Sequence, residues 1–240
     1  MSGQAPSGAA PTDAAPSGAA SALSGAELLD AVRAQRVVPL FYEADAARAA
    51  DAVAGLADGG ARVVEYTLRG PGAERVLATL VAGAPAGVAI GAGSVPDAAT
   101  ARIALDAGAA FIVGPNGDPA IAELCAERGV GYVPGTLTPS EMVAALSWGC
   151  PLVKVFPVAA VGGPAYVKAV RGPLPSLQVM ATGGVGPADL RAYLDAGVAC
   201  VGMGGELVKK AWVQSGDTAA LATAMRAILA DAGATGASGG

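Results

Sequence analysis

The chain of 240 residues contains no histidine, only four lysines and three cysteines. Histidine is the usual general base and a common metal ligand, so its absence excludes Ser-His-Asp triads and His-ligated metals. We therefore expect no metal site, and acid–base chemistry must come from Glu, Asp, Lys, Tyr or water. The cysteines, Cys125, Cys150 and Cys200, are widely spaced and odd in number, which indicates buried thiols in a reducing, cytoplasmic location.

Basic clusters and long apolar runs are also missing. The net charge is −5 and no basic run occurs, so the sequence predicts no nucleic-acid partner. No apolar stretch is long enough to span a membrane, and the N-terminus lacks the basic start and apolar centre of a signal peptide. Residues 1–23 and 232–240 consist mainly of small residues and proline, which predicts flexible tails around one domain at 24–231.

Between these tails, short apolar runs alternate with Ala-rich stretches of helical pattern. Ser24-Gly25-Ala26-Glu27 is a capping box that predicts a first helix. Continuous Val- and Ile-rich runs are typical of strands buried on both faces, as in a parallel sheet. Eight such runs are expected as strands, at 37–42, 62–67, 87–90, 109–113, 131–133, 152–156, 177–181 and 199–203. Helices are expected after them, at 45–56, 73–81, 97–107, 119–128, 139–146, 164–170, 187–196 and 218–231.

This repetition predicts the fold class. Eight strand–helix units over about 200 residues are close to the minimum for a (β/α)8 TIM barrel, here an α/β fold with an extra N-terminal helix. A doubly wound open sheet is the alternative. No Gly-x-Gly-x-x-Gly fingerprint follows the first predicted strand, which counts against a dinucleotide-binding fold.

Lys154 lies in an apolar run, Leu152-Val153-Lys154-Val155-Phe156-Pro157, that is predicted to be a buried strand. A buried amine is costly unless it is paired or loses its charge. The neutral amine is a nucleophile toward carbonyl carbon. The alternative is a lysine at the end of a strand that reaches solvent or pairs with a carboxylate, and the residue alone leaves both open.

Glu65 lies in a second predicted strand, Val63-Val64-Glu65-Tyr66-Thr67. Side chains alternate along a strand, so Glu65 shares one face with Val63 and Thr67. If that face is the barrel lumen, desolvation raises the pKa of the carboxyl and suits it to moving protons. A structural ion pair with Arg69 or Lys154 is the alternative.

Other candidates lie where the carboxyl ends of barrel strands meet, which is where TIM barrels carry their sites. Arg69 and Ser94 are suited to hold a small carboxylate, although a surface arginine and a helix-capping serine are the alternatives. Glycine turns follow the last two strands, at Gly183-Gly184 and Gly204-Gly205. Such turns bind phosphate in many barrels, but tight packing of the turn explains them equally well.

Several motifs occur together in an order and at spacings that are specific as a set. They are 64–69 (VEYTLR), 90–95 (IGAGSV), 133–141 (VPGTLTPSE), 153–157 (VKVFP) and 181–185 (ATGGV). With them, the chain resembles the class I pyruvate aldolases that cleave 2-keto-3-deoxy-6-phosphogluconate (KDPG) or 4-hydroxy-2-oxoglutarate (KHG). The resemblance runs from about residue 28 to residue 230.

The resemblance implies a role for each matching position. Lys154 matches the Schiff-base lysine and Glu65 the proton-transferring glutamate. It implies a carbon–carbon lyase that cleaves a 4-hydroxy-2-oxo acid into pyruvate and an aldehyde, with the covalent imine in place of a cofactor, and a homotrimer. The substrate-binding positions that it implies are Arg69, Ser94, Pro115, Thr182, Gly183, Gly184, Gly204 and Gly205.

The chain departs from the family pattern where the family holds anions. Gly205, followed by Glu206, replaces a serine that often contacts phosphate, and Tyr42 replaces an arginine of some relatives. Gly114 precedes Pro115 where Ser-Pro is common. Losing a hydroxyl donor and gaining a carboxylate should weaken binding of a phosphate dianion. Two alternatives follow: an aldolase restricted to unphosphorylated substrates, or a decayed, non-catalytic oligomeric scaffold.

Overall fold

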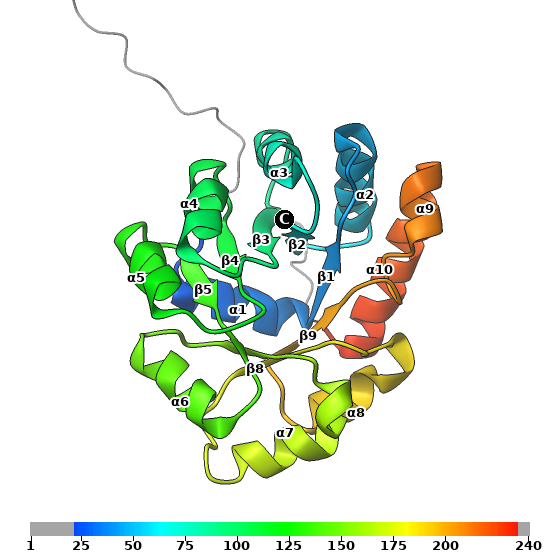
Figure 1. Cartoon of the computed structure of the whole chain (residues 1–240). Coiled ribbons are helices and arrows are strands. Elements are labelled where there is room, and N and C mark those ends of the chain that lie inside the picture. Colours follow the sequence, from blue (N-terminus) through cyan, green and yellow to red (C-terminus); the bar gives the residue numbers. More distant parts are fainter. Residues whose placement is uncertain (1–21, 235–240) are drawn as a thin grey trace, which may run out of the picture.

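The computed structural model describes residues 22–234, in which nine parallel strands form one nearly closed barrel inside a ring of helices (Figure 1). The predicted TIM barrel is therefore confirmed. Around the barrel the strands follow the order β5-β4-β3-β2-β1-β9-β8-β7-β6. They are β1 Val37–Phe41, β2 Val63–Thr67, β3 Ala89–Gly93, β4 Phe111–Val113, β5 Gly131–Val133, β6 Gly135–Thr136, β7 Val153–Val155, β8 Val179–Thr182 and β9 Cys200–Met203.

The predicted fifth strand is found with the same bounds as β5, and the ninth strand is β6, a two-residue strand after Pro134 that was not predicted. Proline has no backbone N–H to donate to a neighbouring strand. Strand β5 pairs with β4, and strand β6 pairs with β7. The carbonyl of Pro134 still accepts a hydrogen bond of 2.8 Å from the backbone N–H of Lys154. One extended stretch thus changes partner at Pro134 and joins the two ends of the sheet.

The helices follow the predicted rhythm, with boundaries that shift by a few residues. The segment at 187–196 begins as a 3-10 turn, and two short helices that the sequence did not predict, η1 and α9, follow β7 and β9. The helical elements are α1 Gly25–Gln35, α2 Ala46–Asp58, α3 Ala73–Ala82, α4 Ala98–Asp106, α5 Pro119–Glu127, α6 Pro139–Ser147, η1 Ala159–Val161, α7 Gly163–Arg171, η2 Pro187–Asp189, α8 Leu190–Asp195, α9 Lys210–Ser215 and α10 Thr218–Ala232.

The expected tails lie mostly outside the described residues, since residues 1–21 and 235–240 are not described. Leu23, placed in the tail by the sequence, exchanges backbone hydrogen bonds with Ala110 and Gly131. At the other end, α10 runs one residue past its predicted limit, to the buried Ala232.

Across residues 22–234, no helix is both long enough and apolar enough to cross a membrane.

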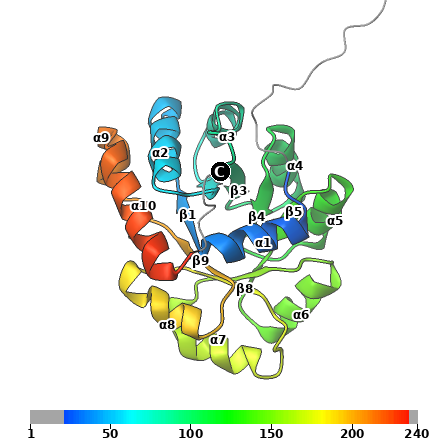
Figure 2. The ribbon, with the colours of Figure 1, turned by 180° about the vertical axis from the view of Figure 1, so that it is seen from behind.

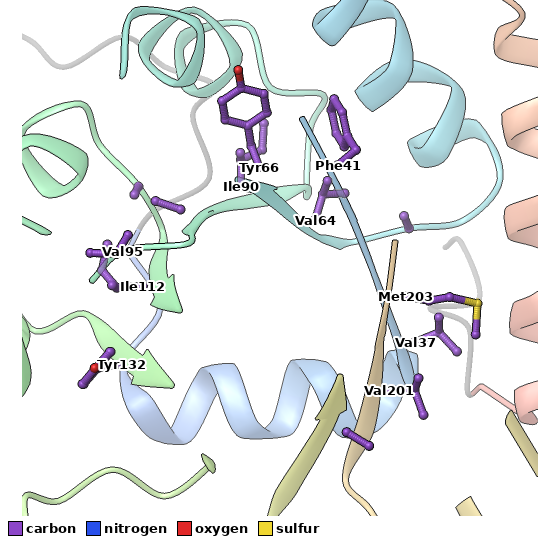
Figure 3. Packing of buried hydrophobic residues seen from close by; sticks show 14 of the residues in the cluster. Val37, Phe41, Val64, Tyr66, Ile90, Val95, Ile112, Tyr132, Val201 and Met203 are labelled. Atoms are coloured by element: carbon purple, nitrogen blue, oxygen red, sulfur yellow. The ribbon is translucent and has the colours of Figure 1, made fainter. Parts of the chain in front are cut away.

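Alternation along the strands divides the core into two layers. Outward-facing side chains such as Val64, Ile90 and Ile112 pack between the sheet and the helices, as Figure 3 shows. Inward-facing side chains such as Val63 and Phe111 fill the lumen together with Leu28 and Val32 of α1. Helix α1 lies across one end of the barrel (Figure 2) and closes it at the amino ends of the strands.

Gln35, at the end of α1, fixes this helix to the sheet. Its buried amide donates to the carbonyls of Val37 and Val63, at 2.8 and 2.7 Å. Its side-chain oxygen accepts from the backbone N–H groups of Arg62 and Val63. One side chain therefore satisfies four backbone groups of β1, β2 and the residue before β2, which the sequence analysis did not foresee.

We expect Gln35→Met to lower the free energy of unfolding by about 3 kcal/mol, because a thioether leaves buried backbone donors and acceptors unpaired. Urea unfolding measures the change, and the exposed Gln214→Met serves as the control. A loss no larger than that of the control would contradict the structural role assigned to Gln35.

Candidate active site

Two charged side chains, Glu65 and Lys154, are buried among residues 22–234, with 1% and 6% of their surfaces exposed. Glu65 is on β2 and Lys154 is on β7, and these strands lie on opposite parts of the barrel ring. Val63, two residues before Glu65, packs in the lumen cluster, so Glu65 faces the lumen as well. Both residues are thus held inside the barrel.

The carboxyl of Glu65 occupies an unusual place for an acid. Its Oε2 atom is buried and accepts no hydrogen bond from the described residues. Burial raises the pKa of Glu65, and the positive charges of Lys154 and Arg69 act against this rise. Gly93 on the neighbouring strand is needed here, since a Cβ atom at that position would overlap the carboxyl of Glu65.

Neither alternative proposed for these residues fits the structure. In the part of the chain that the structure describes, the one ion pair joins Arg128 to Asp106 on the surface. Glu65 therefore forms no contact ion pair with Arg69 or Lys154, and Lys154 does not extend into solvent. An unpaired amine and an unpaired carboxyl face the same lumen, which is the arrangement that proton transfer and nucleophilic attack require.

Lys154 is held by its strand and covered by an aromatic ring. The hydroxyl of Thr136 donates to the Lys154 carbonyl at 3.0 Å. The Nζ atom of Lys154 lies 5.1 Å from the centroid of the Phe156 ring. Phe156 was not among the residues predicted from the sequence, although its position two residues beyond Lys154, just after β7, was a usable signal.

A cavity of about 450 Å³ opens over the carboxyl ends of β1, β2, β8 and β9. It brings together six of the predicted substrate-binding positions. Its remaining polar lining includes groups that the sequence analysis did not select, such as Glu43 and Lys210. The six predicted positions are Arg69, Thr182, Gly183, Gly184, Gly204 and Gly205.

Thr182 is the buried member of this group. Its Oγ1 atom is buried and makes no hydrogen bond with the described residues, although the side chain lines the cavity. Next to it, Gly183 has a φ of 95°, and a Cβ there would come within 3.0 Å of the Phe156 ring. The loop after β8 can therefore pass close to Phe156 only with glycine at this position.

Arg69 and Ser94 meet at the β2 side of the cavity. The Nε atom of Arg69 donates to Ser94 Oγ at 3.3 Å. Ser94 does not cap a helix, because the cap of α4 is Asp97, whose side chain accepts from the N–H of Thr100 at 2.8 Å. The two side chains thus present a guanidinium and a hydroxyl together, which suits a carboxylate ligand.

Pro115 lies apart from these residues. It lines a second cavity, of about 240 Å³, with Thr136, Glu141 and Trp148. Phe156 lines both cavities, so this residue borders the Pro115 side as well as the β8–β9 side. The structure therefore brings six of the ten predicted residues to the main cavity and Pro115 to its neighbour, whereas Glu65, Lys154 and Ser94 line neither of these two cavities.

Comparison with known proteins agrees with this geometry. The family model described as KDPG and KHG aldolase matches residues 28–224. The 2-dehydro-3-deoxy-phosphogluconate aldolase of Pseudomonas aeruginosa is 36% identical over 191 residues, which cover 78% of this chain and 84% of that protein. The chain belongs to the KDPG and KHG aldolase family. It is thus an enzyme of the carbon–carbon lyase class.

Solved structures related to this aldolase share its fold. A KDPG aldolase from Legionella pneumophila, with pyruvate captured as a covalent carbinolamine, superposes with a TM-score of 0.78 and is 28% identical. The match covers 83% of this chain and 97% of that one. A cube-shaped cage designed by fusing symmetric oligomeric domains also contains a similar chain, with a TM-score of 0.72, 29% identity and coverage of 82% and 74%.

Proposed function

We propose that this aldolase cleaves a 4-hydroxy-2-oxo acid through a Schiff base on Lys154. The observation that carries the proposal is the unpaired burial of Lys154 and Glu65 in one lumen. A barrel core is better packed with apolar side chains at both positions, so a structural purpose does not explain the pair. The covalent pyruvate adduct of the Legionella pneumophila relative supports the same chemistry here.

The first step joins the substrate to the enzyme. The amine of Lys154 attacks the C2 ketone, and the carbinolamine that forms takes up a proton from solvent and loses water to give an iminium ion. Hydrolysis of the imine in the last step returns this proton to solvent. Arg69 and Ser94 hold the C1 carboxylate by charge-assisted hydrogen bonds. The iminium nitrogen accepts the electron pair that is released at C3 more readily than the oxygen of the free ketone would.

The second step breaks the carbon–carbon bond. Glu65 takes the proton of the C4 hydroxyl, and the C4 oxygen forms the carbonyl of the aldehyde. The electron pair of the C3–C4 bond becomes the C2–C3 double bond of an enamine, and the C=N electron pair returns to the Lys154 nitrogen. The aldehyde leaves, Glu65 returns the proton to C3, and water hydrolyses the imine to free pyruvate and Lys154. The covalent imine accepts the electron pair of the broken bond, so it takes the place of a cofactor.

Incubation with pyruvate and sodium borohydride tests this proposal. Borohydride reduces the imine to a stable amine, so intact mass should show one adduct per chain and peptide mapping should place it on Lys154. An adduct on another lysine would contradict the assignment. A chain without any adduct would favour the non-catalytic scaffold. The homotrimer and the cytoplasmic location expected from the sequence stay predictions.

A further inference from the structure

The cavity carries a carboxylate at the end formed by the loops after β8 and β9. Glu206 follows β9 and lines the cavity. Its Cβ and Cγ atoms lie 4.0 and 3.8 Å from the position that a Cβ would take at Gly186, so this side chain lies beside the loop after β8. The Gly186 N–H donates to the Asp189 carboxylate at 3.0 Å. A backbone donor is therefore already occupied there, and the adjacent Glu206 supplies negative charge.

The charges along the cavity do not favour a dianion. The charged side chains that line it are Glu43, Arg69, Glu206 and Lys210. Under the proposed function, Arg69 holds the C1 carboxylate of the substrate, which leaves one lysine against two carboxylates. A phosphate ester carries about −1.5 to −2 charges at neutral pH. A single exposed ammonium group does not offset both that charge and the carboxylates.

The cavity also offers partners for hydroxyl groups: Glu206 beside the loop after β8, and Tyr42, whose hydroxyl lies against Gly70 on the β2 side. A carboxylate accepts hydrogen bonds from hydroxyls, and a tyrosine hydroxyl both donates and accepts. Glu206 and Tyr42 both line the cavity, and 37% of the Tyr42 surface is exposed. Gly205 leaves open space, since a Cβ there would have no atom within 4 Å. These features suit a chain that carries hydroxyl groups and no phosphate.

We propose that the aldehyde fragment released by this enzyme is neutral and hydroxyl-bearing, and that Glu206 determines this specificity. The inference rests on the proposed Schiff-base function. Glu206 repels a phosphate group at the far end of the substrate and accepts hydrogen bonds from sugar hydroxyls in its place. The preferred substrates are therefore unphosphorylated 3-deoxy-2-oxo sugar acids.

The test compares kcat/KM for 2-keto-3-deoxygluconate with kcat/KM for its 6-phosphate. The native enzyme should prefer the unphosphorylated acid. In Glu206→Gln, the ratio of the phosphate ester value to the unphosphorylated value should rise about tenfold or more, because the variant removes a charge and keeps the side-chain size. Glu127→Gln, on the exposed end of α5, is the matched control and should leave the ratio unchanged.

Two results would overturn the inference: a native preference for the phosphate ester, or an unchanged ratio in Glu206→Gln. Both are distinct from failure of the proposed function, since each variant is also incubated with pyruvate and borohydride. If Glu206→Gln still traps pyruvate on Lys154 but keeps the native ratio of the two kcat/KM values, only the specificity role of Glu206 is refuted. An enzyme that traps no pyruvate refutes the Schiff-base function.

Discussion

Replacing Lys154 with methionine is expected to lower kcat/KM for cleavage of a 2-oxo acid by about 10⁴-fold or more, because no other group can form the imine. Glu65 and the cavity remain in this variant, yet without the iminium nitrogen nothing accepts the electron pair released at C3. The rate is measured by coupling pyruvate release to a dehydrogenase assay. Borohydride trapping should be lost as well.

The environment of Lys154 makes methionine a suitable replacement. Lys154 is buried, and its inward-facing neighbours Leu152 and Met180 belong to the lumen cluster. An unbranched apolar side chain fits such a site, and removing a buried charge often leaves stability equal or greater. The thermal midpoint of Lys154→Met should therefore be at least that of the native enzyme, which separates loss of chemistry from loss of folding.

The matched control is Lys168→Met on α7, where the native lysine is exposed. It should keep native activity and native trapping. A Lys154→Met enzyme that retains a tenth of the native rate would rule out the imine on this residue.

Replacing Glu65 with glutamine is expected to lower kcat by about 10² to 10⁴-fold, the usual contribution of a positioned general base. Lys154 remains, so pyruvate should still be trapped by borohydride, although more slowly. The pattern of retained adduct and lost cleavage distinguishes a proton-transferring residue from one that merely supports the fold. Native activity in Glu65→Gln would assign the proton transfer to another group.

The pH dependence of the rate follows from the same carboxyl. Glu65 must be ionised to accept the C4 hydroxyl proton, and burial raises its pKa above the ordinary value of 4.5. The native rate should therefore rise with pH over a range above 4.5. The part of this rise that belongs to Glu65 should be missing from the profile of Glu65→Gln.

The free energy of unfolding should change with pH in the opposite direction to the rate, because of the same carboxyl of Glu65. Below pH 4.5 the carboxyl is protonated in both the folded and the unfolded chain, so it adds no pH dependence. As the pH rises, the unfolded chain ionises first, and the native state loses stability until the pH passes the raised pKa. Glutamine does not titrate. Urea unfolding at several pH values should show the native enzyme losing stability relative to Glu65→Gln as the pH rises.

Much of the fold was predictable because it depends on local pattern. Continuous apolar runs predicted the strands, and glycines such as Gly108 and Gly149, which have φ values of 87° and 81°, ended the helices where expected. The short helices η1 and α9 were missed, since each spans too few residues for an apolar period to stand out. The two-residue strand β6 after Pro134 was also missed, because its pairing with β7 depends on which strands meet when the ring closes.

The sequence by itself determined the barrel, the two residues proposed for catalysis and the family, because strand periodicity and motif spacing are properties of neighbouring residues. Only the tertiary structure decided that Glu65 faces the lumen unpaired, that Pro115 lies beside a separate cavity and that Glu43 and Lys210 enter the main one. Alternation along a strand defines two faces but not which of them is enclosed. Enclosure arises when strands distant in sequence close into a ring, which brings β2 opposite β7 and places the loops after β8 and β9 side by side.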